Sequence, residues 1–133
     1  MAYKNKITQK NALDRLTSQY IRTIGRCEHC NSKEVLQNSH IIGRKYIKVR
    51  FDPRNCQCLC AKCHAIFEGN PLAFSEFVFA SSCGQYVETM QIQAYDVSHK
   101  PDYDFWETII KQAIQDLKPL EQLRQDLGRS IIL

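Results

Sequence analysis

Two Cys-x-x-Cys pairs constrain this 133-residue chain more than any other feature of its sequence. Cys27 and Cys30 form the first pair, and Cys60 and Cys63 form the second. Four thiolates are soft ligands that complete a tetrahedral zinc shell with no open position, so the pairs predict a structural zinc site. The 29 residues between the pairs exceed the roughly 15–20 of a simple zinc ribbon, which predicts an inserted element.

The other cysteines leave the choice of ligands open. Cys56 and Cys58 alternate with Cys60, so all three would face the same way on a strand. We prefer Cys60 and Cys63 because a Cys-x-x-Cys at the start of a helix makes the better metal-binding turn. Cys56, Cys58 and Cys83 are then expected to be small buried apolar residues.

Two histidines lie directly beside the predicted ligands in the sequence. His64 is an alternative zinc ligand next to Cys63, whereas His29 is expected to be exposed turn filler. Buried free thiols are the alternative to the whole site, but two such pairs in a reduced protein favour zinc.

The hydrophobic pattern predicts a single α+β domain over residues 1–133. Apolar residues at helical spacing over 8–24 predict an N-terminal helix that Gly25 ends, so residues 1–26 form one part. Residues 27–70 form the zinc-bound core, with strands over 35–42 and 55–59 and a helix over 60–67. Residues 46–51 alternate in part and predict a strand or extended arm. Residues 71–133 form a helical extension of three or four helices.

Charge is distributed unevenly along the chain, although the net charge is only +4. Residues 1–26 carry a net charge of +5, residues 40–54 carry +4, and residues 71–133 carry −4. A basic front and an acidic rear predict that one face meets a polyanion, and ordinary solvated charge is the alternative.

The chain is expected to be cytoplasmic and to have no membrane contact. Met1 is followed by polar residues, and no apolar run reaches the roughly 18 residues that span a bilayer. Seven cysteines is an odd number, which also favours a reduced setting with metal ligands over disulfides.

The insert between the pairs carries a resemblance that covers about 40 residues. Ser39-His40-Ile41-Ile42, then Asn55, then Leu59-Cys60-x-x-Cys63-His64 resembles the HNH endonuclease family in order and spacing. The basic loop that leads to Arg50-Phe51-Asp52-Pro53-Arg54-Asn55 is similar to phage HNH proteins, including the NinG-like recombination nucleases.

The resemblance implies a zinc-stapled, treble-clef-like ββα-metal fold and the hydrolysis of DNA phosphodiester bonds. It implies His40 as the general base that activates water, and Asn55 as the residue that orients His40 or shapes the strand turn. It implies His64 as a ligand of a catalytic Mg²⁺ or Mn²⁺ that polarises the scissile phosphate. A phage-encoded enzyme acting on branched recombination intermediates in the host cytoplasm is the corresponding expectation.

Five basic residues between the two pairs are expected to hold DNA phosphates. They are Arg44, Lys45, Lys48, Arg50 and Arg54.

The chain departs from the family pattern at one position. The residue before the base histidine is usually Asp or His and binds the metal, but here it is Ser39. The metal shell would then rest on His64, Asn55, water and phosphate, or on Asp52.

Two other functions compete with the nuclease. The first is a non-catalytic zinc-finger DNA-binding module that kept the frame and lost the metal through Ser39. The second is a protein-interaction domain whose helical tail presents Trp106 and its apolar neighbours as an exposed patch. The tail is also a candidate homodimer surface.

Overall fold

The computed structural model describes residues 6–130, which form a mostly helical α+β structure around a two-stranded sheet. The predictions for residues 1–5 and 131–133 lie outside the described residues. In chain order, the elements are α1 (Lys6–Arg22), β1 (Leu36–His40), η1 (Pro53–Asn55), β2 (Cys56–Cys60), α2 (Ala61–Glu68), α3 (Pro71–Ala80), η2 (Ser82–Tyr86), α4 (Val87–Tyr95), α5 (Tyr103–Gln115) and α6 (Leu120–Ser130).

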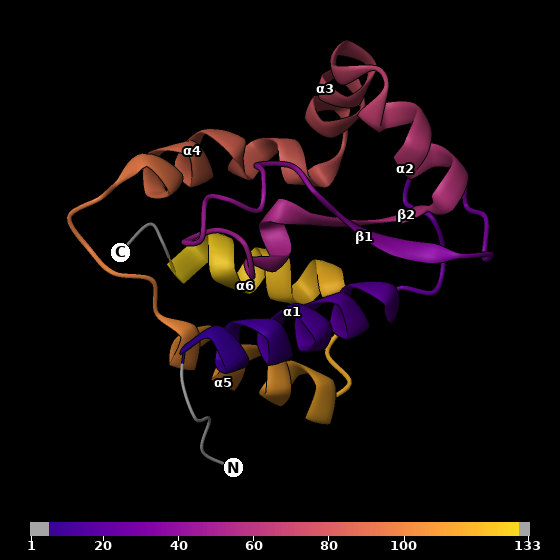
Figure 1. Cartoon of the computed structure of the whole chain (residues 1–133). Coiled ribbons are helices and arrows are strands. Elements are labelled where there is room, and N and C mark those ends of the chain that lie inside the picture. The colour runs from indigo at the N-terminus through magenta and orange to yellow at the C-terminus, as the bar shows by residue number, and fades with distance from the viewer. Residues whose placement is uncertain (1–5, 131–133) are drawn as a thin grey trace.

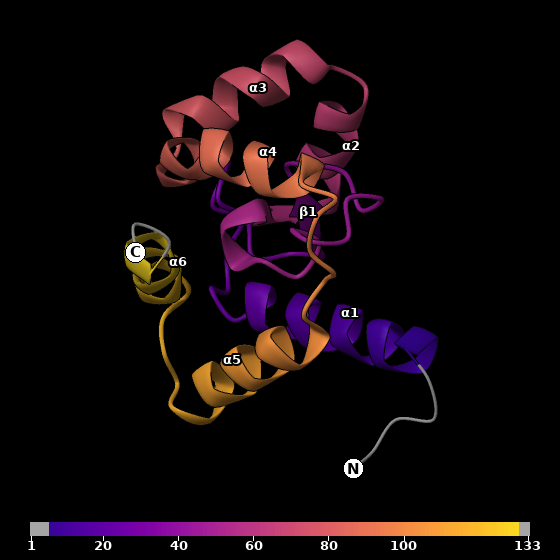
Figure 2. The same cartoon turned by 90° about the vertical axis from the view of Figure 1, so that its left-hand side faces the viewer.

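The sheet lies at the centre of the molecule between two groups of helices. Strands β1 and β2 pair antiparallel, with Leu36 opposite Cys60 and His40 opposite Cys56. Helix α1 lies on one side of the sheet, and α2, α3 and α4 lie on the other (Figures 1 and 2). All five residues of β2 are buried, as expected for a strand with helices on both faces.

The N-terminal helix is held by its apolar face. Leu13, Tyr20 and Ile21 are buried in one cluster with Ile110 of α5. The Tyr20 hydroxyl donates a hydrogen bond of 2.7 Å to the backbone oxygen of Lys118 in the α5–α6 turn. Helix α1 therefore packs against the C-terminal helices as well as the sheet.

The C-terminal helices belong to the core. Leu120, Leu123 and Leu127 of α6 lie in the same buried cluster as α1. Trp106 of α5 is 9% exposed, so the alternative in which it forms part of an exposed patch is wrong. Its large ring fills the interface between α5 and the rest of the core.

The segment between the strands is compact rather than extended. Residues 43–51 form successive turns, in which backbone N–H groups bond to carbonyls three residues back. The alternation over residues 46–51 predicted a strand or extended arm, but these residues form turns, in which Val49 and Phe51 are both buried at 0% exposure. Burial of these two side chains within one loop overrides the local pattern.

Helix boundaries follow local signals. Gly25 has a φ of 77°, which glycine tolerates, and its N–H bonds to the Arg22 carbonyl just beyond α1. The Asn70 side chain accepts from the N–H of Ala73 and caps α3, with Pro71 at the first helical position.

Within residues 6–130, none of the helices has the length and apolar character to cross a bilayer.

Candidate functional site

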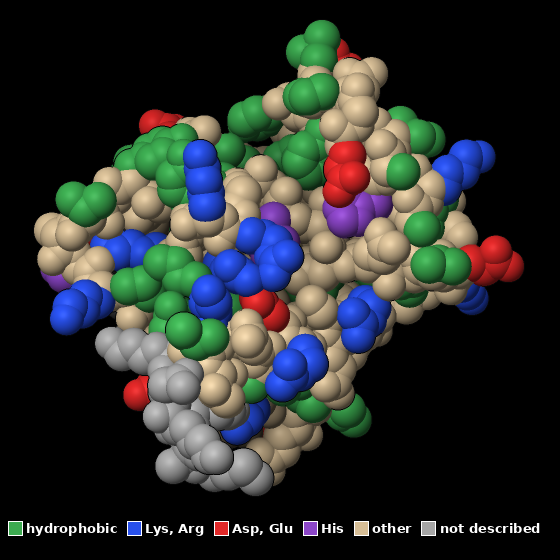
Figure 3. All heavy atoms as spheres, viewed as in Figure 1, with side chains coloured by type: hydrophobic (Ala, Val, Ile, Leu, Met, Phe, Trp, Pro, Cys, Tyr) green, Lys and Arg blue, Asp and Glu red, His purple; other side chains and the backbone are tan. Residues whose placement is uncertain are grey.

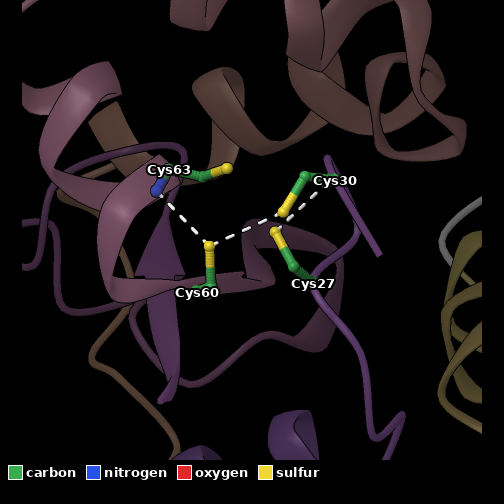
Figure 4. A group of neighbouring side chains, drawn as sticks. All are labelled: Cys27, Cys30, Cys60 and Cys63. Carbon is green, nitrogen blue, oxygen red and sulfur yellow. Dashed lines mark hydrogen bonds between the residues drawn. The ribbon is translucent and has the colours of Figure 1, made fainter. Parts of the chain in front are cut away.

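The two cysteine pairs meet at the junction of β2 and α2. Cys27 and Cys30 come from the turn after α1, Cys60 ends β2, and Cys63 lies in the first turn of α2. The four sulfurs all lie within 4.8 Å of one another. Figure 4 shows the four side chains converging from these two segments.

This geometry fits a tetrahedral zinc ion. Zinc–sulfur bonds of about 2.3 Å at tetrahedral angles place sulfurs about 3.8 Å apart. The sulfurs of Cys30 and Cys60 are 3.7 Å apart. The N–H of Cys30 and the N–H of Cys63 each lie 3.5 Å from the first sulfur of their own pair, as donors to thiolates. The cluster could therefore hold a structural zinc.

The acidity of the thiols is consistent with a cation site. Burial raises the pKa of Cys27, but backbone N–H donors, first that of Cys30, outweigh it and lower the pKa to about 7. Burial and hydrogen bonding among the neighbouring sulfurs raise the pKa of Cys63 well above its ordinary value. Four crowded sulfurs ionise together only when a cation compensates their charge.

The other three cysteines lie in apolar surroundings, as the sequence predicted. Cys56, Cys58 and Cys83 are each at most 1% exposed. Burial raises the pKa of Cys58 and of Cys83 to about 11, and it raises that of Cys56 still further. Cys56, Cys58 and Cys83 also lie outside the group of four sulfurs that could hold a metal ion.

His29 contributes more than turn filler. Its ring packs edge-on against Phe67 and Phe77, with centroids 4.9 and 5.1 Å away. Its Nδ1 lies 3.2 Å from the sulfur of Cys63. His29 is exposed and lies in the turn, as predicted, but it is more than filler, because it can donate to a metal-bound thiolate, an outer contact that tunes zinc sites.

The predicted base and the predicted catalytic-metal ligand line the same cavity. His40 ends β1, and His64 lies on α2 one residue after Cys63. Both line a cavity of about 450 Å³, together with Ser39, Arg44 and Glu68. Figure 3 shows histidine side chains on this face of the molecule, close to basic side chains and to a carboxylate.

His40 is oriented and kept neutral by its surroundings. Its Nε2 lies 2.9 Å from the backbone oxygen of Arg50, and a carbonyl can only accept, so Nε2 carries the hydrogen. Nδ1 is then left with a lone pair. Burial lowers the pKa of His40 below its ordinary value, and the Arg44 charge lowers it further. A neutral imidazole with a free lone pair is the form that a general base needs.

Asn55 holds the loop that orients His40. Its side-chain NH₂ donates to the carbonyls of Ile42 and Val49, both at 3.0 Å. Its Oδ1 accepts from the N–H of Ile42 at 2.7 Å. Asn55 is fully buried, so its amide shapes the loop that carries the Arg50 carbonyl and does not reach a ligand.

His64 pairs with a carboxylate that the sequence analysis did not single out. Its Nδ1 lies 2.8 Å from Oε1 of Gln37, which leaves the Nε2 lone pair on the side of Glu68. The His64 Nε2 and a Glu68 oxygen are 3.4 Å apart. An i, i+4 spacing on one helix was the sequence signal for this pair. Nitrogen and oxygen together are suitable donors for a divalent cation.

Two of the five predicted phosphate-binding residues, Arg50 and Arg54, form short ion pairs with carboxylates of the protein itself. Arg54 is 1% exposed, and its Nε lies 3.0 Å from Asp52, so the phosphate prediction for Arg54 is wrong. The ion pair with Asp52 offsets the cost of burying the Arg54 guanidinium. The Arg50 guanidinium binds Asp14 through two nitrogens, at 2.9 and 2.6 Å.

The remaining basic residues point outward to different degrees. Arg44 and Lys45 are exposed, although Arg44 also lies 3.3 Å from Asp14. Lys48 is half-buried and lies 3.7 Å from Asp96. Arg44 and Lys45 are therefore the basic residues best placed for an anionic ligand.

Asp52 and Asn55, the two residues suggested to replace the missing acidic ligand, are not available to bind a cation. Asp52 is fully buried against Arg54, and the Asn55 amide is saturated by backbone groups. Ser39 lines the cavity at 4% exposure. Glu68 is thus the acidic side chain of this cavity that lies on the His64 side.

Comparison with known proteins identifies no relative: no family model, no curated protein and no solved structure matches the chain.

Proposed function

We propose that the chain is a metal-dependent endonuclease of the HNH type that hydrolyses DNA phosphodiester bonds. One observation carries the proposal: His40 from the end of β1 and His64 from α2 line a single cavity with Arg44. The four-cysteine cluster supports it, because a zinc ion there would join the turn after α1 to the end of β2 and the start of α2, and β2 pairs with the strand that bears His40.

His40 acts as the general base in this proposal. Its Nδ1 takes a proton from water, and the Arg50 carbonyl stabilises the protonated ring through Nε2. Asn55 acts as a positioning residue, since it ties down the loop that supplies this carbonyl.

His64 and Glu68 hold the catalytic divalent cation, Mg²⁺ or Mn²⁺. When bound, the ion polarises the scissile phosphate and stabilises the leaving oxygen. Glu68 takes over the acidic donor that the sequence lacks at Ser39, and its exposed side chain reaches the cavity from the same helix as His64. Arg44 and Lys45 bind the flanking phosphates of the DNA.

A cleavage assay on plasmid DNA with Mg²⁺ or Mn²⁺ tests the proposal. We expect His40→Ala to slow cleavage by roughly 10²- to 10⁴-fold, the usual contribution of a general base. His99→Ala is the matched control, because the His99 side chain is 81% exposed on the α4–α5 loop. Cleavage that persists unchanged in His40→Ala contradicts the assignment.

Ser39 favours a second candidate, a zinc module that binds DNA without cutting it. A hydroxyl is a poor ligand where the family carries Asp or His, so the cation site would be too weak to act. This candidate predicts salt-sensitive DNA binding and no cleavage with any divalent ion. If Ser39→Asp creates cleavage that the natural chain lacks, the second candidate is correct.

A further inference from the structure

Two tyrosines meet beside the cavity on the surface of the molecule. Tyr46 lies in the loop between β1 and η1, and Tyr95 is the last residue of α4. Their rings contact edge to face, with centroids 5.2 Å apart at 82°. Tyr95 is 62% exposed, so aromatic surface remains open to solvent. Core packing does not account for this pair.

A cation accompanies the aromatic pair. The Lys45 ammonium lies 5.1 Å from the centre of the Tyr46 ring. Lys45 is exposed and forms no ion pair among the residues that the structure describes. Its charge is therefore available to an anionic ligand. We call Lys45, Tyr46 and Tyr95 the tyrosine–lysine patch.

The nearby acidic residue does not repel an anion strongly. Asp96 follows Tyr95, but its carboxylate accepts from the N–H and hydroxyl of Ser98 and lies 3.7 Å from the Lys48 ammonium. Its charge is thus largely compensated. Ile92 and Val97 are 68% and 96% exposed and extend the apolar surface around Tyr95.

The patch adjoins the cavity along the chain. Arg44 lines the cavity, and Tyr46 follows two residues later, so their Cα atoms are no more than about 7.6 Å apart. Figure 3 shows basic and hydrophobic side chains mixed on this face, next to the histidines. A strand whose phosphate occupied the cavity would pass its neighbouring nucleotides over the patch.

Exposed rings combined with cations form the chemistry that binds unpaired nucleotides. Bases stack on aromatic faces, and lysine neutralises the adjacent phosphate, whereas paired bases in a duplex keep their faces covered. We propose that the tyrosine–lysine patch binds single-stranded DNA beside the cavity, so that the preferred substrate contains unpaired nucleotides. The inference rests on the proposed DNA function and names its substrate class.

Anisotropy with labelled DNA tests the patch apart from catalysis. The probes are a thymidine strand of about 15 nucleotides, within the usual site sizes of single-strand binders, and a blunt duplex of equal length. Titrations contain no added Mg²⁺ or Mn²⁺, so that binding is measured without cleavage. We expect the natural chain to bind the single strand more tightly than the duplex.

The variants separate stacking from charge. Tyr95→Leu should weaken single-strand binding by about 5- to 140-fold, the size of one lost base–aromatic stack, and leave duplex binding unchanged. Tyr95→Phe should bind like the natural chain. Phe79→Leu is the matched control, because Phe79 is 65% exposed on α3 outside the patch. Lys45→Gln should lower the salt dependence by about one phosphate contact.

Three results would overturn the inference: tighter binding of the duplex by the natural chain, unchanged single-strand binding in Tyr95→Leu, or an equal loss on both probes. The proposed nuclease function is refuted by a different result, namely cleavage that does not depend on His40. A patch that binds single strands in a chain without nuclease activity would therefore still be recognised.

Discussion

At the residue scale, the central feature is a histidine whose protonation is set by its neighbours. The Arg50 carbonyl fixes the hydrogen of His40 on Nε2, and burial disfavours the charged ring. Arg44 and Arg50 further disfavour the added proton, whereas Asp14 favours it and is itself paired with both arginines. The net result is a lowered pKa, which suits a base that works at neutral pH.

The lowered pKa of His40 predicts how cleavage depends on pH. In the proposed mechanism cleavage needs the neutral ring of His40, so activity should persist at pH 6.5 and fall only as the pH drops through the lowered pKa. A pH–rate profile of cleavage at saturating Mg²⁺ or Mn²⁺ measures this limb. An acid limb centred at or above pH 6.5 would contradict the burial argument.

The same shift predicts a change in stability. Below about pH 6.5 the unfolded chain binds a proton at His40 that the folded chain resists, so the free energy of unfolding should fall with decreasing pH there. His40→Gln should remove that part of the pH dependence. Urea titrations at several pH values between 5 and 7.5 measure the free energy of unfolding of both proteins. If this free energy changes with pH equally in both, the prediction is refuted.

At the element scale, the cysteine cluster joins the turn after α1 to the start of α2. Cys60 acts twice, because its sulfur belongs to the cluster and also accepts from the N–H of Cys63 as the cap of α2. A small apolar group, including Leu59 and Phe67, surrounds the cluster. A hydrophobic cluster this small predicts that a metal bound by the four cysteines stabilises this part of the chain.

Metal removal should therefore unfold this part of the chain. Elemental analysis of the purified protein should find one zinc per chain, and Cys63→Ala should lose it. Cys83→Ala is the control, because the buried Cys83 lies outside the cluster. A strong chelator should lower the helical signal in circular dichroism. Retention of zinc by Cys63→Ala would contradict the ligand set.

At the scale of the whole molecule, one buried arginine ties the C-terminal helix α6 to the turn that carries Cys27 and Cys30. Arg124 of α6 is fully buried and binds both oxygens of Glu28, at 2.7 and 3.1 Å. It also donates to the carbonyls of Pro53 and Cys56. Hydrogen bonds from Arg124 to Glu28 raise the pKa of Arg124 against the effect of burial, so the ion pair stays charged.

This ion pair predicts that the helical tail is required for folding. Arg124→Met should lower the free energy of unfolding by about 3–5 kcal/mol, since it leaves Glu28 without its partner in a largely buried site. Arg129→Ala, one turn later on a side chain that is 73% exposed, should change it by no more than about 0.5 kcal/mol. Urea unfolding measures both. Equal effects would show that Arg124 is not a tie between the parts.

The sequence by itself determined the local structure. The Cys-x-x-Cys spacing predicted the cluster of four, and hydrophobic periodicity predicted both strands and the helices within a few residues. It also predicted Cys56, Cys58 and Cys83 as buried apolar residues. These properties depend on neighbours close in the chain, which is why pattern and spacing suffice for them.

Only the tertiary structure decided which polar side chains are free to act. The sequence predicted the same phosphate-binding role for Arg54 and Arg44. In the structure, Arg54 is buried in an ion pair with Asp52, whereas Arg44 lines the cavity. Tyr46 and Tyr95 lie 49 residues apart, and nothing local predicts that their rings meet. Exposure and long-range pairing depend on how distant elements pack, and that information is absent from any short stretch of the chain.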